Sequence, residues 1–339
     1  MLVGADGSSA VLIGTHHRPA LSMSRSTQPR LAAMVTVSFP DQFWLDDVGP
    51  VDGITPVVWD PEGPVPDEDV EVFVAPYMGG ARSVEPVAQK PSVRLVQLFS
   101  AGYEDVLPVL PKGVALANGA GVHDDSTAEL AVGLALASLR GIDDAARDMT
   151  SGSWTAHRRE RRSLADSRVL LLGYGSIGRA ITRRLAPFEV SVTAVASRAR
   201  AGDELVDSVH GVDELPELLP QHDVVVVIVP LTDATAGLLG DELLGALPDG
   251  ALVVNVARGP VLDTDAVLRQ AGRISFALDV TDPEPLPADH PLWSAPGVLV
   301  TPHVGGMSTA FRPRGVRLLR EQLRALGAGE DPINVVGHG

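Results

Sequence analysis

Three charged side chains follow apolar, β-branched runs in the C-terminal half of the chain, where strands of a sheet are expected to end. They are Arg258 in Asn255-Val-Ala-Arg-Gly-Pro260, Glu284 in Leu278-Asp-Val-Thr-Asp-Pro-Glu-Pro285 and His303 in Leu299-Val-Thr-Pro-His-Val-Gly-Gly306. Open parallel sheets bind ligands beyond the carboxyl ends of their strands. Alone, each side chain has an ordinary explanation, as a surface turn, a solvated loop acid or a hydrogen-bonded turn histidine. Their common place at one sheet edge favours a functional site.

The three residue types suit transfer of a hydride to the carbonyl carbon of a keto acid. Negative charge then develops on the carbonyl oxygen, and a protonated histidine can neutralise it by giving up its proton. A carboxylate beside the imidazole favours its protonated form. The planar fork of arginine matches a carboxylate and can polarise the adjacent carbonyl. We therefore expect His303 as acid/base, Glu284 as its partner and Arg258 as the substrate anchor.

The hydride donor is indicated by a glycine-rich segment further upstream. Gly173-Tyr-Gly-Ser-Ile-Gly178 fits G-x-G-x-x-G, directly after the apolar run Val169 to Leu172. Ile177, Ala180, Ile181 and Leu185 then recur at helical spacing until Pro187. Strand, glycine turn and helix in this order are typical of dinucleotide binding, with the pyrophosphate at the helix start. The expected cofactor contacts here are Gly173, Gly175, Ser176, Ile177 and Gly178.

The end of the following strand bears on the choice between NAD(H) and NADP(H). NAD-preferring domains usually carry an acid there, about 20 residues past the glycines, for the ribose 2′-hydroxyl. This chain reads Val195-Ala-Ser-Arg-Ala-Arg200, without an acid. Ser197 can hydrogen-bond a 2′-phosphate, and Arg198 and Arg200 can neutralise it. NADP(H) is therefore the expected cofactor, with NAD(H) possible.

The domain organisation follows from the spacing of short β-branched runs. Val35 to Phe39, Thr55 to Trp59, Val70 to Ala75, Val93 to Leu98 and Val114 to Asn118 predict a first α/β sheet without a glycine fingerprint. The turn Leu98 to Tyr103 closes one of these strands, and its N–H groups could hold a carboxylate. Residues 1–33 have no clear period and are expected to be a disordered head, with a cleaved targeting segment as the alternative.

A second α/β sheet is predicted from Arg168 onward, reached through a helix from Ala128 to Leu139. Ser126 and Glu129 fit a capping box at the start of that helix, and its apolar surface indicates burial and a dimer interface. The predicted strands are Val169 to Leu172, Val190 to Val195, Asp223 to Val229, Ala251 to Val256, Ile274 to Leu278 and Val298 to Val300. A final helix, Ser308 to Leu326, is expected to return to the first domain. The domains are therefore 34–127 plus 307–339, and 128–306.

Composition excludes several classes of function. The 339 residues carry a formal net charge of -16, which argues against a general nucleic-acid or anionic-membrane binder. There is no cysteine, so disulfides, zinc-thiolate sites and thiol nucleophiles are excluded, and no metal site is expected. No apolar run approaches the length of a membrane span. A cytoplasmic protein is the expectation.

From about Met34 to Val336 the sequence resembles the D-isomer-specific 2-hydroxyacid dehydrogenases, and within them the glyoxylate/hydroxypyruvate reductase type. The motifs that carry the resemblance are Leu172-Gly-Tyr-Gly-Ser-Ile-Gly-Arg179, Val229-Pro-Leu-Thr-Asp-Ala-Thr-Ala-Gly-Leu238, Asn255-Val-Ala-Arg-Gly259, Ala277-Leu-Asp-Val280 with Glu284-Pro-Leu286, His290-Pro-Leu-Trp293 and Thr301-Pro-His-Val-Gly-Gly306. The resemblance implies an α/β fold of two Rossmann-like or flavodoxin-like parallel-sheet domains with the active site in the cleft between them.

The resemblance also implies roles for single residues. Arg258 is expected to bind substrate, His303 to act as the acid/base, Glu284 to pair with it, and Asp279 to help orient the nicotinamide. Asp282, two residues from Glu284, stays open as the alternative carboxylate. The backbone of Ser100, Ala101 and Gly102 is expected to receive the substrate carboxylate. Further cofactor contacts are expected at Pro230, Thr235, Val256, Ala257, His303 and Gly305.

Other functions within reach of these motifs are kept as alternatives. One is an NAD-linked dehydrogenase of D-lactate, phosphoglycerate, formate or phosphite type. The other is a non-enzymatic dinucleotide sensor, which an intact Arg258, Glu284 and His303 disfavours. The sequence does not name the keto acid or the direction of flux. A homodimer through the cofactor domain is expected. Local packing is the ordinary explanation for Trp154, and reaching a neighbouring subunit is its alternative role.

Overall fold

Short buried strands form the frame of the structure, a computed structural model that describes residues 34–154 and 160–339. The expected disordered head lies outside the described residues. Within them the strands form a six-stranded and an eight-stranded sheet. The sequence pattern predicted a mixed α/β fold with two parallel-dominated sheets, and this is confirmed.

The first sheet contains the early runs of the sequence and the last strand of the chain. Its spatial order is β14-β5-β4-β3-β1-β2, and all neighbours are parallel except β14 against β5. Without β14 this is the flavodoxin-like order 2-1-3-4-5. The bounds are β1 Val35–Phe39, β2 Ile54–Val58, β3 Val72–Val74, β4 Leu95–Gln97, β5 Ala115–Ala117 and β14 Val335–His338.

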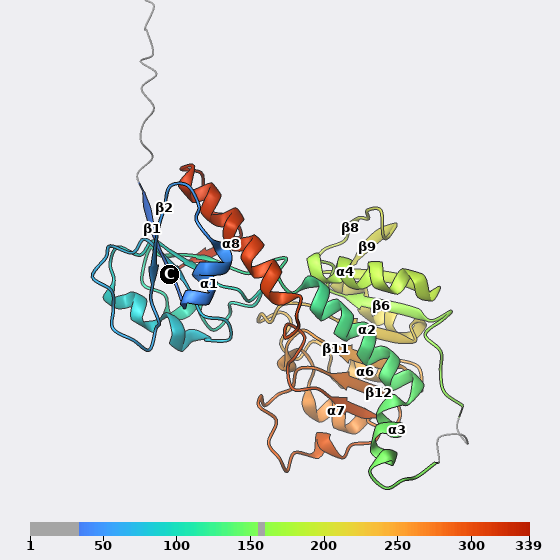
Figure 1. The fold of residues 1–339 in the computed structure, drawn as a ribbon. Helices are drawn as coiled ribbons and strands as arrows, with labels where there is room; N and C mark the ends of the chain where they lie inside the picture. The colour runs from blue at the N-terminus through green and yellow to red at the C-terminus, as the bar shows by residue number, and fades with distance from the viewer. Residues whose placement is uncertain (1–33, 155–159) are drawn as a thin grey trace, which may run out of the picture. The chain divides into compact units, whose positions relative to one another are not determined.

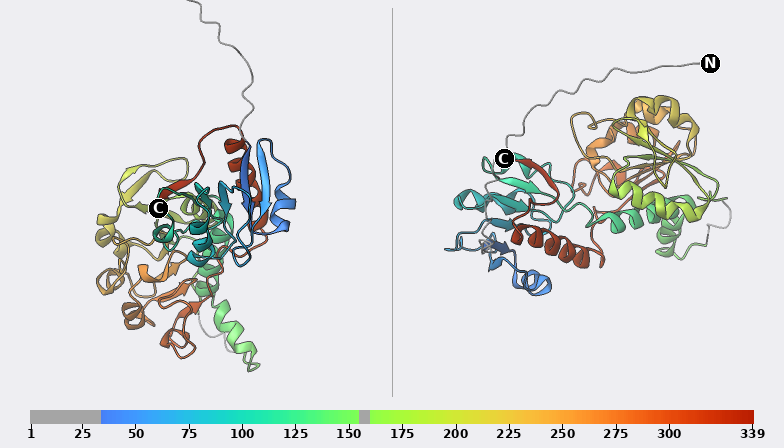
Figure 2. Two further views of the ribbon diagram at one scale, coloured as in Figure 1. Left: turned by 90° about the vertical axis from the view of Figure 1, so that its left-hand side faces the viewer. Right: turned by 90° about the horizontal axis from the view of Figure 1, so that it is seen from above.

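Strand alternation divides the residues of this sheet between two apolar layers. Val72 and Val74 pack with helices α1 (Gln42–Val48) and α8 (Phe311–Gly327), whereas Phe73 between them packs with the 3₁₀ segment η1 (Ala81–Gln89). Figure 2 shows α8 lying along the strands of this sheet. The end of the chain thus supplies one covering helix and one edge strand to the sheet that begins at β1.

The second sheet has the order β13-β12-β11-β10-β6-β7-β9-β8, in which β8 alone is antiparallel to its neighbour among the described strands. The run β9-β7-β6-β10-β11-β12 reproduces the order 3-2-1-4-5-6 of dinucleotide-binding sheets. The bounds are β6 Arg168–Leu172, β7 Ser191–Ala196, β8 Arg200–Ala201, β9 Ser208–Gly211, β10 Val224–Val227, β11 Leu252–Asn255, β12 Ser275–Leu278 and β13 Val298–Val300.

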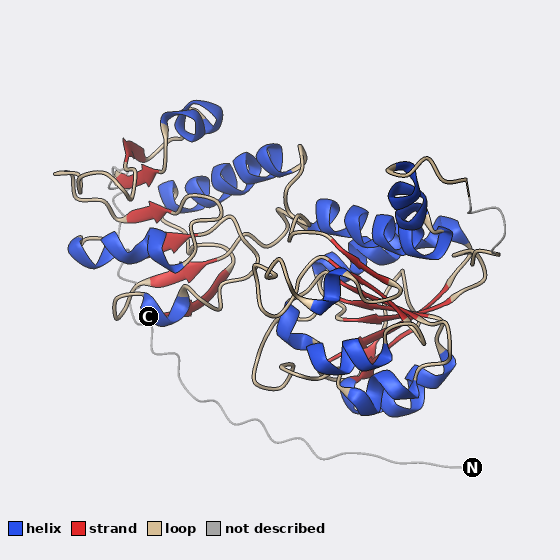
Figure 3. Cartoon of the chain, turned by 90° about the horizontal axis from the view of Figure 1, so that it is seen from below, coloured by secondary structure: helices blue, strands red, loops and turns tan. Residues whose placement is uncertain are grey.

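Helices cover both faces of the second sheet (Figures 1 and 3). On one face α2 (Asp124–Arg140) and α4 (Ser176–Leu185) pack against alternate residues of β6 and β10. The other residues of the same strands face α5 (Leu215–Leu218), α6 (Asp241–Ala246) and α7 (Thr264–Gln270). The strand order reverses between β6 and β10, so the glycine loop after β6 lies at the position where such sheets bind ligands.

The expected capping box at Ser126 is wrong. Helix α2 begins at Asp124, so Ser126 lies inside its first turn, and Glu129 contacts Arg184 at 3.4 Å. The hydroxyl of Ser126 shares a 2.5 Å hydrogen bond with that of Ser308. Two acids at the helix start, Asp124 and Asp125, favour the earlier beginning because they interact well with the positive end of the helix dipole.

Further elements differ from the pattern in the sequence. The predicted last helix begins three residues later than expected, at Phe311, with Pro313 in its first turn. Strands β8, β9 and β14 were not predicted, because they have two to four residues each and none is a continuous apolar run. Helix α3 (Ile142–Met149) extends from α2, and Trp154 beyond it is 88% exposed. No helix in the described ranges is long and apolar enough to cross a membrane.

Candidate active site

Arg258, Glu284 and His303 follow three neighbouring strands of the second sheet. Arg258 comes three residues after β11, Glu284 lies beyond β12 and His303 beyond β13. Because these strands are parallel, their carboxyl ends meet at one edge of the sheet. The sheet therefore brings to one edge the three side chains that the sequence singled out.

The Nδ1 atom of His303 lies 2.5 Å from Oε1 of Glu284. Both side chains are partly exposed, at 38% and 40%, so the pair is open to a solute. The alternative carboxylate, Asp282, makes no hydrogen bond or ion pair with the imidazole in the described part of the chain. Its backbone carbonyl accepts a hydrogen bond from the Thr264 hydroxyl at 2.9 Å. The carboxylate that pairs with the imidazole is Glu284.

The turn that carries His303 is held by Asp279, which is 2% exposed. Its carboxylate accepts hydrogen bonds from the Thr301 hydroxyl at 2.7 Å, the Val304 N–H at 2.9 Å and the Gly305 N–H at 2.8 Å. Its backbone carbonyl accepts from the His303 N–H at 2.8 Å. His303 has φ 51°, a left-handed conformation that costs a residue with a β-carbon free energy. The Asp279 contacts hold the turn in this conformation.

Arg258 lies against the loop that was expected to receive a carboxylate. A β-carbon added to Gly102 would lie 1.6 Å from Nη2 of Arg258, so the guanidinium group fills the space that the missing side chain leaves. Nη1 donates to the carbonyl of Ala257 at 2.7 Å, and Nη2 lies 3.5 Å from Oε2 of Glu104. Asn255 supports this turn by donating to the Arg258 carbonyl at 3.0 Å.

The loop of Ser100, Ala101 and Gly102 is fixed through its carbonyl groups. Ser100 Oγ donates to the carbonyl of Gly102 at 2.8 Å, and Asn118 Nδ2 donates to that of Ala101 at 2.7 Å. The N–H groups of Ala101 and Gly102 donate to no atom within residues 34–154 and 160–339. A loop with fixed carbonyls and free N–H groups beside a guanidinium group suits an anion.

The glycine loop has the geometry that a dinucleotide requires. A β-carbon on Gly178 would lie 2.2 Å from the carbonyl oxygen of Gly173, so only glycine permits this approach of helix and turn. A β-carbon on Gly175 would meet nothing within 4 Å, so the backbone there faces open space. Ser176 begins α4, and its hydroxyl donates to Asp124 at 3.2 Å. These residues fit a pyrophosphate at the start of α4.

The three residues expected at the 2′-phosphate are exposed, and the structure gives contacts for one of them. Arg200 donates from Nη2 to the carbonyl of Tyr174 at 2.9 Å, inside the glycine loop. Ser197 and Arg198 are exposed at the end of β7 and have no hydrogen bond or ion pair with the rest of the described chain. An acid that the sequence argument did not consider, Asp203, pairs with Arg179 close by.

The remaining expected cofactor contacts also lie at strand ends. Pro230 follows β10, and its carbonyl accepts from the hydroxyl of Thr235 at 2.7 Å. Val256 and Ala257 follow β11 and are buried. Gly305 is held by Asp279, as described above. Among the described residues no group of three or more His, Cys, Asp or Glu side chains could hold a metal ion.

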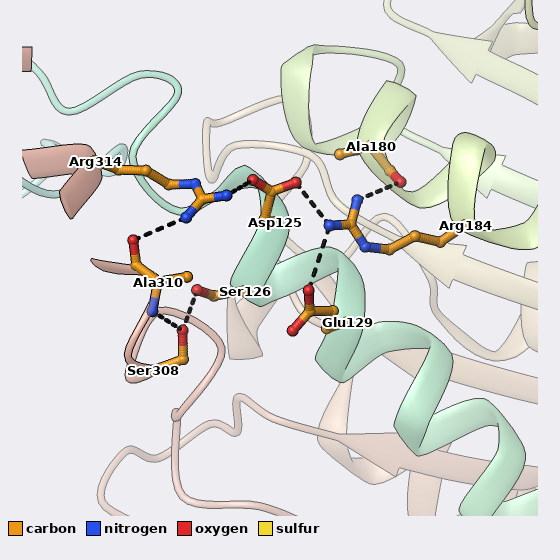
Figure 4. A network of polar contacts seen from close by, with 8 residues as sticks. All are labelled: Asp125, Ser126, Glu129, Ala180, Arg184, Ser308, Ala310 and Arg314. Atoms are coloured by element: carbon orange, nitrogen blue, oxygen red, sulfur yellow. Dashed lines mark hydrogen bonds and ion pairs between the residues drawn. The ribbon is translucent and has the colours of Figure 1, made fainter. Parts of the chain in front are cut away.

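A polar network surrounds the first turn of α2, and Figure 4 shows Asp125 at its centre, between Arg314 and Arg184. Asp125 pairs with Arg314 from α8 and, at 2.6 Å, with Arg184 from α4. The Arg184 and Arg314 hydrogen bonds hold the pKa of Asp125 below its usual value, against the opposing effect of burial. Helices α2, α4 and α8 are thus joined by one carboxylate.

Sequence reasoning missed Glu104, Tyr174 and Asp203. Glu104 and Tyr174 contact the predicted site residues Arg258 and Arg200, and Asp203 pairs with Tyr174 and Arg179. Glu104 follows the loop of Ser100, Ala101 and Gly102, called the anion loop from here on. Tyr174 is the variable position after the first glycine, and Asp203 follows Arg200 by three residues. Each of these three residues lies near a motif residue in the sequence, and this nearness was a signal that could have indicated it. Nothing in the sequence alone tells which partner each side chain meets, because the partners of Glu104 and Asp203 come from distant segments.

Comparisons with known proteins agree with this geometry. Residues 132–305 match the family model described as D-isomer specific 2-hydroxyacid dehydrogenase, NAD binding domain. The chain is 31% identical over 269 residues to the glyoxylate reductase/hydroxypyruvate reductase of Homo sapiens, an alignment that covers 75% of this chain and 82% of that protein.

Two solved structures extend the likeness over most of the chain. A D-isomer specific 2-hydroxyacid dehydrogenase from Xanthobacter autotrophicus Py2, in complex with NADPH and MES, is 30% identical with a TM-score of 0.71, over 90% of this chain and 98% of that one. An NADPH-dependent glyoxylate/hydroxypyruvate reductase from Sinorhizobium meliloti, in complex with citrate, is 25% identical with a TM-score of 0.72, over 89% and 98%. The chain belongs to the D-isomer specific 2-hydroxyacid dehydrogenases and is an NAD(P)-dependent oxidoreductase.

Proposed function

We propose that the protein is an NADP(H)-dependent reductase of small 2-keto acids of the glyoxylate and hydroxypyruvate type. The observation that carries this proposal is the 2.5 Å contact between His303 Nδ1 and Glu284 Oε1. Because Glu284 occupies Nδ1, the other ring nitrogen, Nε2, is left to exchange a proton with substrate. A dinucleotide bound at the glycine loop would supply a hydride for the carbonyl carbon. In the proposal His303 holds the proton that the carbonyl oxygen would receive.

Substrate binding is assigned to Arg258 and the anion loop. The guanidinium group and the free N–H groups of Ala101 and Gly102 can share one carboxylate, because Arg258 lies directly against Gly102. The contact of Arg258 with Ala257 fixes the orientation of its fork. In this assignment Glu104 balances the arginine charge while substrate is absent. Ser100 fixes the loop through its hydroxyl.

The cofactor is assigned to the glycine loop and the end of β7. Ser197, Arg198 and Arg200 are proposed to bind the 2′-phosphate, and support comes from the position of Arg200 at the loop. The similar protein from Xanthobacter autotrophicus Py2 was crystallised with NADPH. Pro230, Thr235, Val256, Ala257, Asp279 and Gly305 are proposed as further contacts along the nucleotide. NAD(H) is expected to be the weaker cofactor.

The test is steady-state oxidation of NADPH with glyoxylate, hydroxypyruvate, pyruvate, phenylpyruvate and branched keto acids, repeated with NADH. We expect the highest kcat/KM for glyoxylate or hydroxypyruvate with NADPH. Equal kcat/KM with the two cofactors would contradict the NADP(H) assignment. Cofactor binding without turnover of any of these acids would contradict the catalytic roles.

We also propose the domain bounds 34–127 plus 307–339 and 128–306. The packing of α8 and β14 with the first sheet supports them.

A homodimer through the cofactor domain is proposed because the apolar side chains of Ile142, Met149 and Trp154 are exposed. Light scattering coupled to size-exclusion chromatography measures the molar mass and so tests the dimer. Met149→Glu should shift the protein from dimer to monomer. The cytoplasm is proposed from composition alone.

A further inference from the structure

Strands β8 and β9 form a hairpin that carries both Arg200 and Asp203. Arg200 pairs with Val209 in the antiparallel register. The turn is closed by Gly202 N–H donating to the Asp207 carbonyl at 3.2 Å and by Asp203 N–H donating to that of Val206 at 2.9 Å. Asp203 thus lies at the turn of the hairpin, three residues beyond the arginine.

The carboxylate of Asp203 attaches the turn of this hairpin to the glycine loop and to α4. Oδ1 accepts from the Tyr174 hydroxyl at 2.8 Å and from the Leu205 N–H at 2.9 Å, while Oδ2 pairs with Arg179. Tyr174 is buried, with 6% of the residue exposed. Burial, together with the neighbouring Asp203 carboxylate, raises the pKa of Tyr174 to about 12, so the phenol stays a proton donor.

Arg200, on strand β8, contacts the same tyrosine. Its Nη2 donates to the Tyr174 carbonyl at 2.9 Å, and its guanidinium carbon lies 6.0 Å from the centre of the ring. Tyr174 lies between Gly173 and Gly175. The hairpin is therefore attached to one residue of the glycine loop twice, by the Asp203 carboxylate and by the Arg200 guanidinium group.

We propose that Asp203 is a positioning residue for cofactor selectivity: it holds the β8–β9 hairpin on Tyr174 and Arg179 and so keeps Arg200 at the place of the 2′-phosphate. The inference rests on the proposed NADP(H) function. In this inference Asp203 does not contact the 2′-phosphate itself. Its negative charge is balanced by Arg179, whose Nη2 also lies 2.8 Å from Oε1 of Glu204.

A role of Asp203 through its charge and a role in positioning Arg200 predict opposite changes in the affinity for a 2′-phosphate when Asp203 is neutralised. If Asp203 acted only through its charge, Asp203→Asn would remove a repulsion and strengthen the binding of a 2′-phosphate. If Asp203 positions Arg200, the same variant releases the hairpin and weakens that binding. The size and shape of the side chain are retained in asparagine, so the sign of the change separates the two explanations.

The experiment measures the Kd of NADPH and of NADH by titration calorimetry, together with kcat, for wild type, Asp203→Asn, Tyr174→Phe, Arg200→Ala and the control Glu204→Gln. Glu204 lies on the same hairpin and pairs with Arg179, but its side chain is 64% exposed and makes no hydrogen bond with Tyr174 among the described residues. For Asp203→Asn we expect the Kd of NADPH to rise about tenfold, because about one charge-assisted hydrogen bond from Arg200 would be lost.

The Kd of NADH and kcat at saturating cofactor should stay within about twofold of wild type, since NADH has no 2′-phosphate for Arg200 to bind. Tyr174→Phe should show a smaller change in the same direction, and Glu204→Gln none. Melting temperatures identify variants that fail to fold, and Tyr174→Phe keeps the test valid if Asp203→Asn is one of them.

Unchanged or tighter NADPH binding in Asp203→Asn overturns the inference. Equal weakening of both cofactors also overturns it, because it shows a merely structural role. If Arg200→Ala weakens NADPH while Asp203→Asn does not, the proposed NADP(H) function stands and the inference alone fails. If wild type and Arg200→Ala bind the two cofactors equally, the proposed cofactor assignment fails and the inference with it.

Discussion

The guanidinium group of Arg258 occupies the space in which a β-carbon on Gly102 would lie, 1.6 Å from Nη2. The two residues are far apart in the sequence, and each was expected to contact the substrate carboxylate. Their close contact requires the absence of a side chain at position 102. The position of the arginine therefore depends on a glycine in another segment of the chain.

Gly102→Ala should displace Arg258. The KM for the keto acid should rise by about tenfold or more, because one charged contact with the substrate carboxylate would be lost. Stability should change little, because the clashing atom is the end of a flexible side chain. Steady-state kinetics and thermal melting test this. Gly133→Ala in α2 is the control, since a β-carbon there meets nothing within 4 Å. An unchanged KM in Gly102→Ala would show that Arg258 does not need this position.

His303→Ala should lose about 10²–10⁴-fold in kcat, the usual contribution of a positioned acid/base. Cofactor affinity should be nearly retained, since the Asp279 contacts to the turn use backbone groups of residues 303–305. Rapid kinetics and cofactor titration measure the two effects. A variant that binds cofactor and keeps near wild-type turnover would remove His303 from the mechanism.

Glu284→Gln should lower kcat by less than His303→Ala does, because the amide keeps a contact with the imidazole but does not stabilise its protonated form. Asp282→Asn is the matched control two residues away, and its activity should equal that of wild type. The comparison is made by kcat across a range of pH. Equal losses in both variants would indicate a general effect on the loop.

Asp279→Asn should destabilise the turn that carries His303. One of the three hydrogen bonds to the carboxylate would meet the NH₂ group of asparagine, and a buried N–H left without an acceptor costs about 1–3 kcal/mol. We expect a lower melting temperature together with a lower kcat. Thr301→Val removes a single hydrogen bond at 2.7 Å and should have a smaller effect. A kcat equal to that of wild type would mean that the turn keeps its conformation without Asp279.

Stability should depend on pH through Asp125. Its folded-state pKa is lowered, first by the Arg184 hydrogen bond, so the group stabilises the fold above its ordinary pKa and this stabilisation is lost as pH falls through the lowered value. Asp125→Asn should therefore be less stable than wild type at pH 7, and the difference should narrow below about pH 4. Urea unfolding at several pH values measures it. A difference that does not change with pH would indicate that the charge of Asp125 is not responsible.

The second sheet was largely predictable from sequence, because its strands are continuous apolar runs such as Val224 to Val227 and its first turn carries three glycines. The contact of Glu284 with His303 was expected from the resemblance and is present. The start of α2 was not predictable from Ser126, because two acids upstream already favour the helix. The hairpin of β8 and β9 could not be predicted because its strands are too short to show a pattern. Without the hairpin, the contacts of Asp203 could not be predicted either.

The antiparallel pairing of β14 with β5 bears on the order in which the chain folds during synthesis. Every strand of the eight-stranded sheet lies between β5 and β14 in the sequence, so that sheet is fully translated before the edge of the other one can be completed. Domains generally fold as units as they leave the ribosome. The nascent chain therefore presents β5 as an open edge, and the surface that α8 will cover as bare apolar side chains, until α8 and β14 emerge. Truncation at the C-terminus should thus impair the domain that is translated first.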